Sequence, residues 1–69
     1  MFKKVNHIHF IGIGGIGMSG IAELLMNLGF NITGSDIDHS QNVQRLEKIG
    51  IKISIGHAEK NINGADAIV

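Results

Sequence analysis

The sequence predicts a small α/β domain with an open parallel sheet of four strands in the order 3-2-1-4. Short segments of alternating apolar and polar residues are separated by segments with helical spacing, and glycines mark the junctions. Strands that alternate with helices form parallel sheets with right-handed crossovers. The third strand alternates so regularly that one of its faces must meet solvent, which places it at the sheet edge. The expected arrangement is Rossmann-like.

The first strand and the first helix flank a run of glycines. Residues 5–11 are expected to form a strand that carries His7 and His9 on the same face. After the glycines, the apolar residues fall on one stripe of a helix: Ile21, Leu24, Leu25 and Leu28. Gly29 then occupies the position of a left-handed C-terminal cap.

The second half of the sequence repeats this alternation with another helix. A second strand is expected over residues 30–35, and Ser40 can cap the helix that follows. The buried side of that helix is expected to consist of Val43, Leu46 and Ile49. Residues 51–55 are predicted as the third strand, and residues 65–69 as the opening of a fourth strand in which the sequence stops. We therefore expect one domain, residues 1–69, cut from a longer protein.

Composition excludes several classes of function. The 69 residues carry six basic and six acidic side chains, so no broad basic face exists to bind nucleic acid. The absence of cysteine excludes disulfides and thiolate zinc sites, and it favours a cytoplasmic location. No apolar run reaches the length of a membrane span. Any anion must therefore be bound by a local arrangement.

The motif Gly12-x-Gly14-x-x-Gly17 follows the first strand and opens the first helix, and Asp36 follows Gly17 by 19 residues at the end of the second strand. Gly12 permits a tight turn, Gly14 lets the backbone approach a diphosphate, and Gly17 lets the helix pack close to the strand. The diphosphate would lie at the helix N-terminus, where unpaired N–H groups and the helix dipole attract an anion. Asp36 would accept hydrogen bonds from ribose hydroxyls. The alternatives are a tight turn without a ligand and an Asp36 that serves only the turn.

Among the histidines, only His57 is expected to contact a ligand. It follows the third strand on the same carboxyl edge as the glycine motif, where ligands of open α/β sheets bind. His7 and His9 have no third ligand at a recognisable spacing, so we expect hydrogen-bonded structural residues and no metal site. His39 is assigned no role. The sequence contains neither a Gly-x-x-x-x-Gly-Lys-Ser/Thr loop for ATP nor a nucleophile-base pair, so it is expected to bind and not to catalyse.

The run HFIGIGGIGMSGIA, residues 9–22, is similar to the opening of the UDP-N-acetylmuramate:L-alanine ligases, members of the Mur ligase family that act in peptidoglycan synthesis. Three later groups match in order and approximate spacing: Gly34-Ser35-Asp36, Leu46 with Gly50-Ile51, and Gly56-His57. The resemblance covers essentially the whole chain. It implies that the UDP moiety contacts Gly12, Ile13, Gly14, Gly15, Ile16, Gly17, Ser35, Asp36 and His57.

The resemblance also implies an activity. The family joins L-alanine to the lactyl carboxylate of UDP-N-acetylmuramate in the cytoplasm, using ATP and magnesium through an acyl-phosphate intermediate. Its N-terminal domain holds the UDP, whereas the ATP and amino-acid sites lie in later domains, so these 69 residues alone are expected to be inactive.

Several alternatives remain open at this point. A tripeptide-recycling ligase and the later amino-acid-adding ligases share the domain plan, although the Gly-Ile-Gly-Gly-Ile-Gly-Met-Ser-Gly run favours the alanine ligase. An NAD-binding oxidoreductase domain would use the same loop and acidic residue for an adenosine ribose. A regulatory module that senses a nucleotide without chemistry is a third hypothesis.

Overall fold

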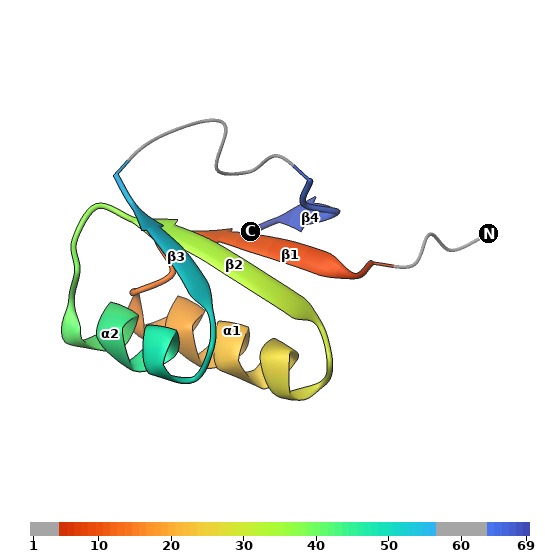
Figure 1. The fold of residues 1–69 in the computed structure, drawn as a ribbon, viewed down its shortest axis with the longest axis horizontal. Helices are drawn as coiled ribbons and strands as arrows, with labels where there is room; N and C mark the ends of the chain where they lie inside the picture. The colour runs from red at the N-terminus through yellow and green to blue at the C-terminus, as the bar shows by residue number, and fades with distance from the viewer. Residues whose placement is uncertain (1–4, 57–63) are drawn as a thin grey trace.

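The computed structural model describes residues 5–56 and 64–69. Its elements follow one another as β1 (His7–Ile11), α1 (Ile16–Asn27), β2 (Asn31–Asp36), α2 (Gln41–Lys48), β3 (Lys52–Ile55) and β4 (Ala67–Ile68). The strands form one parallel sheet in the order β3-β2-β1-β4, which confirms the predicted order and the edge position of β3 (Figure 1).

The residues that end and begin the helices are those that the sequence predicts. Gly29, directly after the C-cap of α1, has a φ of +102°, which only glycine adopts easily. The Ser40 side chain caps α2 by accepting a hydrogen bond from the Val43 N–H at 3.2 Å. Val43 and Leu46 are fully buried, but Ile49 is 37% exposed because it is the C-cap residue and lies beyond the last helical turn.

The two helices of the described residues, α1 and α2, lie on the same side of the sheet, so the two faces of the sheet differ (Figure 1). The face under the helices is apolar, and its core consists of Ile8, Phe10, Ile13, Ala22, Ile32, Leu46 and Ile51. On the other face, the central strands place His9 beside Thr33 and Ile11 beside Ser35. The alternation within β1 thus separates an apolar core from a second face, which carries the two histidines and which no helix of residues 5–56 and 64–69 covers.

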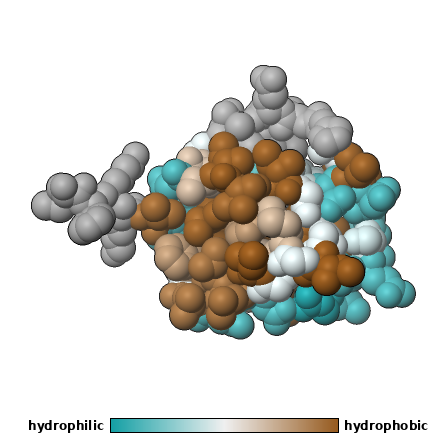
Figure 2. Space-filling model, turned by 180° about the vertical axis from the view of Figure 1, so that it is seen from behind, coloured by the Kyte–Doolittle hydropathy of each residue, from teal (hydrophilic) through white to brown (hydrophobic). Residues whose placement is uncertain are grey.

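The side of α1 that packs on the sheet is not the predicted one. Its buried residues are Ser19 and Ala22, and the partly buried residues that pack on the core are Met18, Leu25 and Met26. Only Leu25 belongs to the predicted stripe, whose other members, Ile21, Leu24 and Leu28, are 49–66% exposed. Small side chains at the contact let the helix approach the strands closely, so the larger side chains remain outside. Seen from behind, the molecule has a broad apolar surface (Figure 2).

Candidate functional site

The glycine loop between β1 and α1 is tied to β2 by its backbone and by one side chain. The N–H groups of Gly12 and Ile13 both donate to the Ser35 carbonyl, at 2.8 and 3.1 Å. The Ile13 side chain is fully buried over Gly34, where an added Cβ would lie 2.8 Å from the Cβ of Ile13. Ile13 therefore anchors the loop to the sheet and does not present its side chain to a ligand. Gly12 makes the predicted tight turn, with a φ of +72°.

Both the N–H and the carbonyl of Gly14 form hydrogen bonds with side chains. Its N–H donates to Oδ2 of Asp36 at 2.8 Å, and its carbonyl accepts from Nδ2 of Asn42 at 3.0 Å. A Cβ at this position would lie 2.8 Å from both Asp36 Oδ2 and Val43 Cγ2. Glycine is therefore required at this position by packing against β2 and α2. Asn42 was not predicted from the sequence, because an Asn on a helix gives no signal of a contact that depends on tertiary structure.

Gly17 does not have the role that the fingerprint predicted. A Cβ at Gly17 would meet no atom within 4 Å, so its lack of a side chain is not what allows α1 to pack on the strands. The expected packing role is wrong for this chain because Ser19 and Ala22 form the close contact instead. Gly17 leaves open space at the start of the helix.

The N-terminus of α1 presents three N–H groups ahead of the first helical hydrogen bond. That bond joins the Ser19 N–H to the Gly15 carbonyl at 2.8 Å, so the N–H groups of residues 16–18 precede it. No side chain caps this end, and the Ile16 side chain is 90% exposed. The helix dipole adds a positive partial charge at the same place. This end of α1 can bind a phosphate by N–H donation without any basic side chain.

A hollow of about 270 Å³ lies beside the loop, at the carboxyl ends of β1 and β2. Its lining residues are Ile11, Gly12, Ser35, Asp36 and Ile37. The structure thus brings the predicted pair Ser35 and Asp36 together with the loop at one edge of the sheet. His57 lies outside the described residues.

Asp36 has a structural task at this edge that the sequence did not reveal. Besides the bond from Gly14, its Oδ1 accepts from the Asp38 N–H at 3.2 Å. Each carboxylate oxygen has a second lone pair, so these backbone bonds are compatible with additional hydrogen bonds from ribose hydroxyls. Asp36 orders the loop whether or not it also contacts a ligand.

The two histidines of β1 are hydrogen-bonded, as the sequence analysis expected. Nε2 of His7 and Nδ1 of His9 each lie 2.8 Å from Oγ1 of Thr33, and Nε2 of His9 lies 3.3 Å from Oγ of Ser35. His9 is only 1% exposed, and this burial lowers its pKa, with a further contribution from the neighbouring His7. Within residues 5–56 and 64–69, no three His, Asp or Glu side chains are grouped to hold a metal ion.

Two surface pairs involve residues that the sequence left without a role. Nε2 of His39 lies 2.6 Å from Oε1 of Glu47, which links the connection after β2 to the last turn of α2. Arg45 of α2 donates to Glu23 of α1 and joins the two helices. All four side chains are between 38% and 53% exposed, so water screens both pairs and each contributes little to stability.

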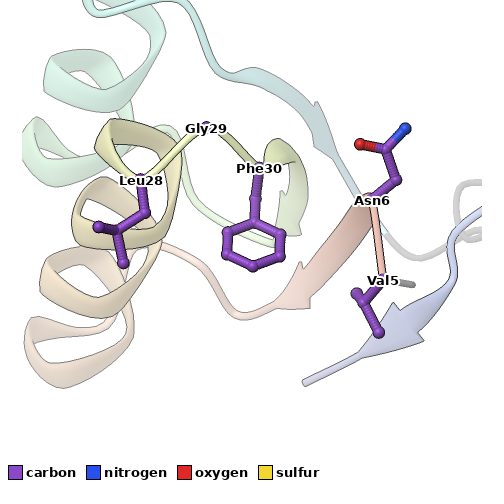
Figure 3. A pocket seen from close by; sticks show the side chains of 5 residues that line it. All are labelled: Val5, Asn6, Leu28, Gly29 and Phe30. Carbon is purple, nitrogen blue, oxygen red and sulfur yellow. The ribbon is translucent and has the colours of Figure 1, made fainter. Parts of the chain in front are cut away.

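A second hollow, of about 350 Å³, lies at the opposite end of β1 and has a different chemistry. It is lined by Val5, Asn6, Leu28, Gly29 and Phe30. In Figure 3 the Asn6 amide points away from the three apolar side chains. None of these five residues is charged or begins a helix, so this part of the hollow offers a diphosphate no group that would bind it.

One protein family matches nearly the full chain, including the glycine loop, α1 and the end of β2. The family described as "Mur ligase family, catalytic domain" matches residues 7–69. The chain belongs to the Mur ligase family. No helix within the described parts of this Mur ligase chain is long and apolar enough to cross a membrane.

Relatives with curated names agree with this membership. Over its full length, the chain is 60% identical to a UDP-N-acetylmuramate–L-alanine ligase of Persephonella marina and 62% identical to one of Thiobacillus denitrificans. It spans only 15% of the length of each.

Solved structures give the same result for the fold. A UDP-N-acetylmuramate-alanine ligase of Thermotoga maritima superposes with a TM-score of 0.86 at 37% identity, covering 94% of this chain and 15% of that protein. A murein peptide ligase of Psychrobacter arcticus gives a TM-score of 0.87 at 33% identity, covering 93% of this chain and 14% of that protein. The fold alone therefore does not separate these two kinds of ligase.

Proposed function

We propose that this chain is the N-terminal, UDP-binding domain, residues 1–69, of a UDP-N-acetylmuramate:L-alanine ligase of peptidoglycan synthesis. The complete enzyme would join L-alanine to the lactyl carboxylate of UDP-N-acetylmuramate, in the cytoplasm. The names of the relatives with 60% and 62% identity support this choice of substrate.

The observation that carries the proposal is the open N-terminus of α1, which ends the loop whose first residue, Gly12, lines the hollow together with Ser35 and Asp36. The N–H groups of residues 16–18 would donate to the diphosphate of the UDP. Asp36 and Ser35 would face the nucleoside from the end of β2. In the loop, the N–H groups of residues 12–15 already donate to protein oxygens, so these residues would hold the shape of the site.

ATP and magnesium, which the proposed reaction requires, do not fit the residues of this chain. The sequence has no Gly-x-x-x-x-Gly-Lys-Ser/Thr loop. The described residues also group no three carboxylates or histidines that could hold a metal ion. The chemistry would take place outside these 69 residues, whose task is to bind and orient the UDP end of the substrate.

A murein peptide ligase is the second candidate, because the solved structure of one superposes as well as that of the alanine ligase. The higher identity to the curated alanine ligases favours the first candidate. The oxidoreductase hypothesis finds no support, since the family match and the named relatives are ligases.

Calorimetric titration of the chain with UDP-N-acetylglucosamine and with NAD tests the proposal. We expect weak binding of the UDP-sugar and none of NAD. Replacing Asp36 by Asn should lower the affinity for the UDP-sugar by about 1–2 kcal/mol, because a neutral amide accepts weaker hydrogen bonds from ribose hydroxyls. Binding of NAD alone would contradict the proposal, and equal affinity of the parent and the Asp36→Asn variant would remove Asp36 from the site.

A further inference from the structure

The face of the sheet opposite α1 and α2 carries an unbroken series of hydrogen bonds that ends at the proposed nucleotide site. It begins at the Gly64 carbonyl, 3.1 Å from Nδ1 of His7. It continues through His7 Nε2, Thr33 Oγ1 and His9 Nδ1, with two distances of 2.8 Å. It ends with His9 Nε2 at 3.3 Å from Oγ of Ser35, a lining residue of the hollow. We call these four side chains the histidine relay.

The direction of every proton in the neutral histidine relay follows from its first member. The Gly64 carbonyl can only accept, so Nδ1 of His7 carries the proton and Nε2 is bare. The Thr33 hydroxyl must then donate to His7, which uses its single proton and leaves its oxygen to accept from Nδ1–H of His9. His9 Nε2 is bare in turn, so the Ser35 hydroxyl donates to it.

One added proton on His9 reverses Ser35. It occupies Nε2 of His9 and donates to the Ser35 oxygen. Ser35 then accepts from His9, and its own proton becomes free to point into the hollow.

We propose that the histidine relay sets Ser35 as a hydrogen-bond acceptor toward the ligand, so that the site selects a donor there, a ribose hydroxyl or an imide N–H, and loses affinity when His9 gains a proton. His9 and Thr33 are thus positioning residues that act through Ser35. The inference rests on the proposed nucleotide site, whereas the direction of the histidine relay does not.

Charged groups near the histidine relay come from three elements of the described structure. The Asp66 carboxylate, just before β4, accepts from the N–H groups of Asn6 and His7. Lys52 of β3 is the register partner of Thr33, and Asp36 follows Ser35 on β2. Burial, with a further contribution from the neighbouring His7, lowers the pKa of His9 and favours its neutral ring at neutral pH.

The first test needs no ligand and no variant. Nitrogen-15 NMR of the imidazoles distinguishes a protonated from a bare ring nitrogen. At about pH 7.5, the neutral ring of each of these histidines, His7 and His9, should carry its proton on Nδ1 with a bare Nε2. A proton on Nε2 of His9 at that pH would overturn the direction of the histidine relay.

The second test measures affinity for UDP-N-acetylglucosamine, whose diphosphate is a diester and keeps a constant charge over the pH range used. Between about pH 7.5 and a lower pH at which nitrogen-15 NMR shows His9 to be protonated, affinity should fall by roughly two- to tenfold, which corresponds to one hydrogen bond. Thr33→Val interrupts the relay and should bind as weakly at the higher pH as the parent does at the lower pH. Thr33→Ser restores the hydroxyl and should restore the pH profile.

The outcomes separate the two proposals. Binding that is tight at both pH values, with the same profile in Thr33→Val, would overturn the role of the histidine relay and leave the nucleotide site intact. Absence of UDP-sugar binding, with both histidines protonated on Nδ1, would overturn the proposed function and leave the direction of the relay established.

Discussion

The two faces of the sheet use different interactions. Under the helices, Phe10 is fully buried in a core of apolar side chains whose contribution depends on shape and apolar area. On the opposite face, His9 is almost as deeply buried, but its ring is held by hydrogen bonds to Thr33 and Ser35. Parallel sheets usually carry apolar residues on both faces. The difference teaches that one face stabilises the domain, whereas the other fixes the directions of polar groups beside the site.

Substituting one residue on each face should lower the free energy of unfolding by different amounts. Phe10→Ala removes a fully buried ring and should lower the free energy of unfolding by about 3–5 kcal/mol, enough to unfold a small domain. Thr33→Val leaves two histidine nitrogens without a hydroxyl and should cost about 1–3 kcal/mol. Urea unfolding followed by circular dichroism measures both. A larger loss for Thr33→Val would show that the polar face supplies the main stability.

Gly14 and Gly17 differ in the reason for which each lacks a side chain, either packing within the domain or the approach of a ligand. Gly14→Ala places a Cβ against Asp36 and Val43 and should destabilise the domain by about 1–3 kcal/mol. Gly17→Ala meets no atom within 4 Å and should raise stability by about 0.5–1 kcal/mol through helix propensity. Thermal melting of the two variants should therefore shift in opposite directions.

The same pair separates fold from function. A Gly17→Ala variant that is folded but no longer binds a UDP-sugar would show that this glycine serves the ligand. If Gly14→Ala melted at the parent's temperature, the clamp formed by Asp36 and Asn42 would be looser than the distances indicate.

The smallest expected effect concerns pH. Because the pKa of His9 is lower in the folded chain than its ordinary value near 6.5, the unfolded chain binds more protons at mildly acidic pH. The His9 contribution to stability is therefore full above about pH 6.5 and declines as the pH falls through that value. Urea unfolding at a series of pH values measures the decline, and the His9→Gln variant should show a shallower one. An identical slope in the variant would assign the pH dependence to other groups.

The sequence predicted the strand order, the edge position of β3 and the Ser40 cap, because each depends on local spacing or on one residue. It could not choose the packed side of α1, since Ala22 and Leu24 belong to adjacent stripes that are both compatible with burial. The Asn42 contact and the histidine relay join residues 24 to 28 positions apart, and only the tertiary arrangement brings them together. The binding roles predicted for Ser35 and Asp36 remain predictions.

The central claim is that the open end of α1 binds the diphosphate of a UDP-sugar. Amide NMR of the chain during titration with UDP-N-acetylglucosamine tests it most directly. The account predicts that the largest shifts occur at the N–H groups of residues 16–18, with smaller shifts at Ser35 and Asp36. Largest shifts around Leu28 and Phe30, at the opposite hollow, would contradict it.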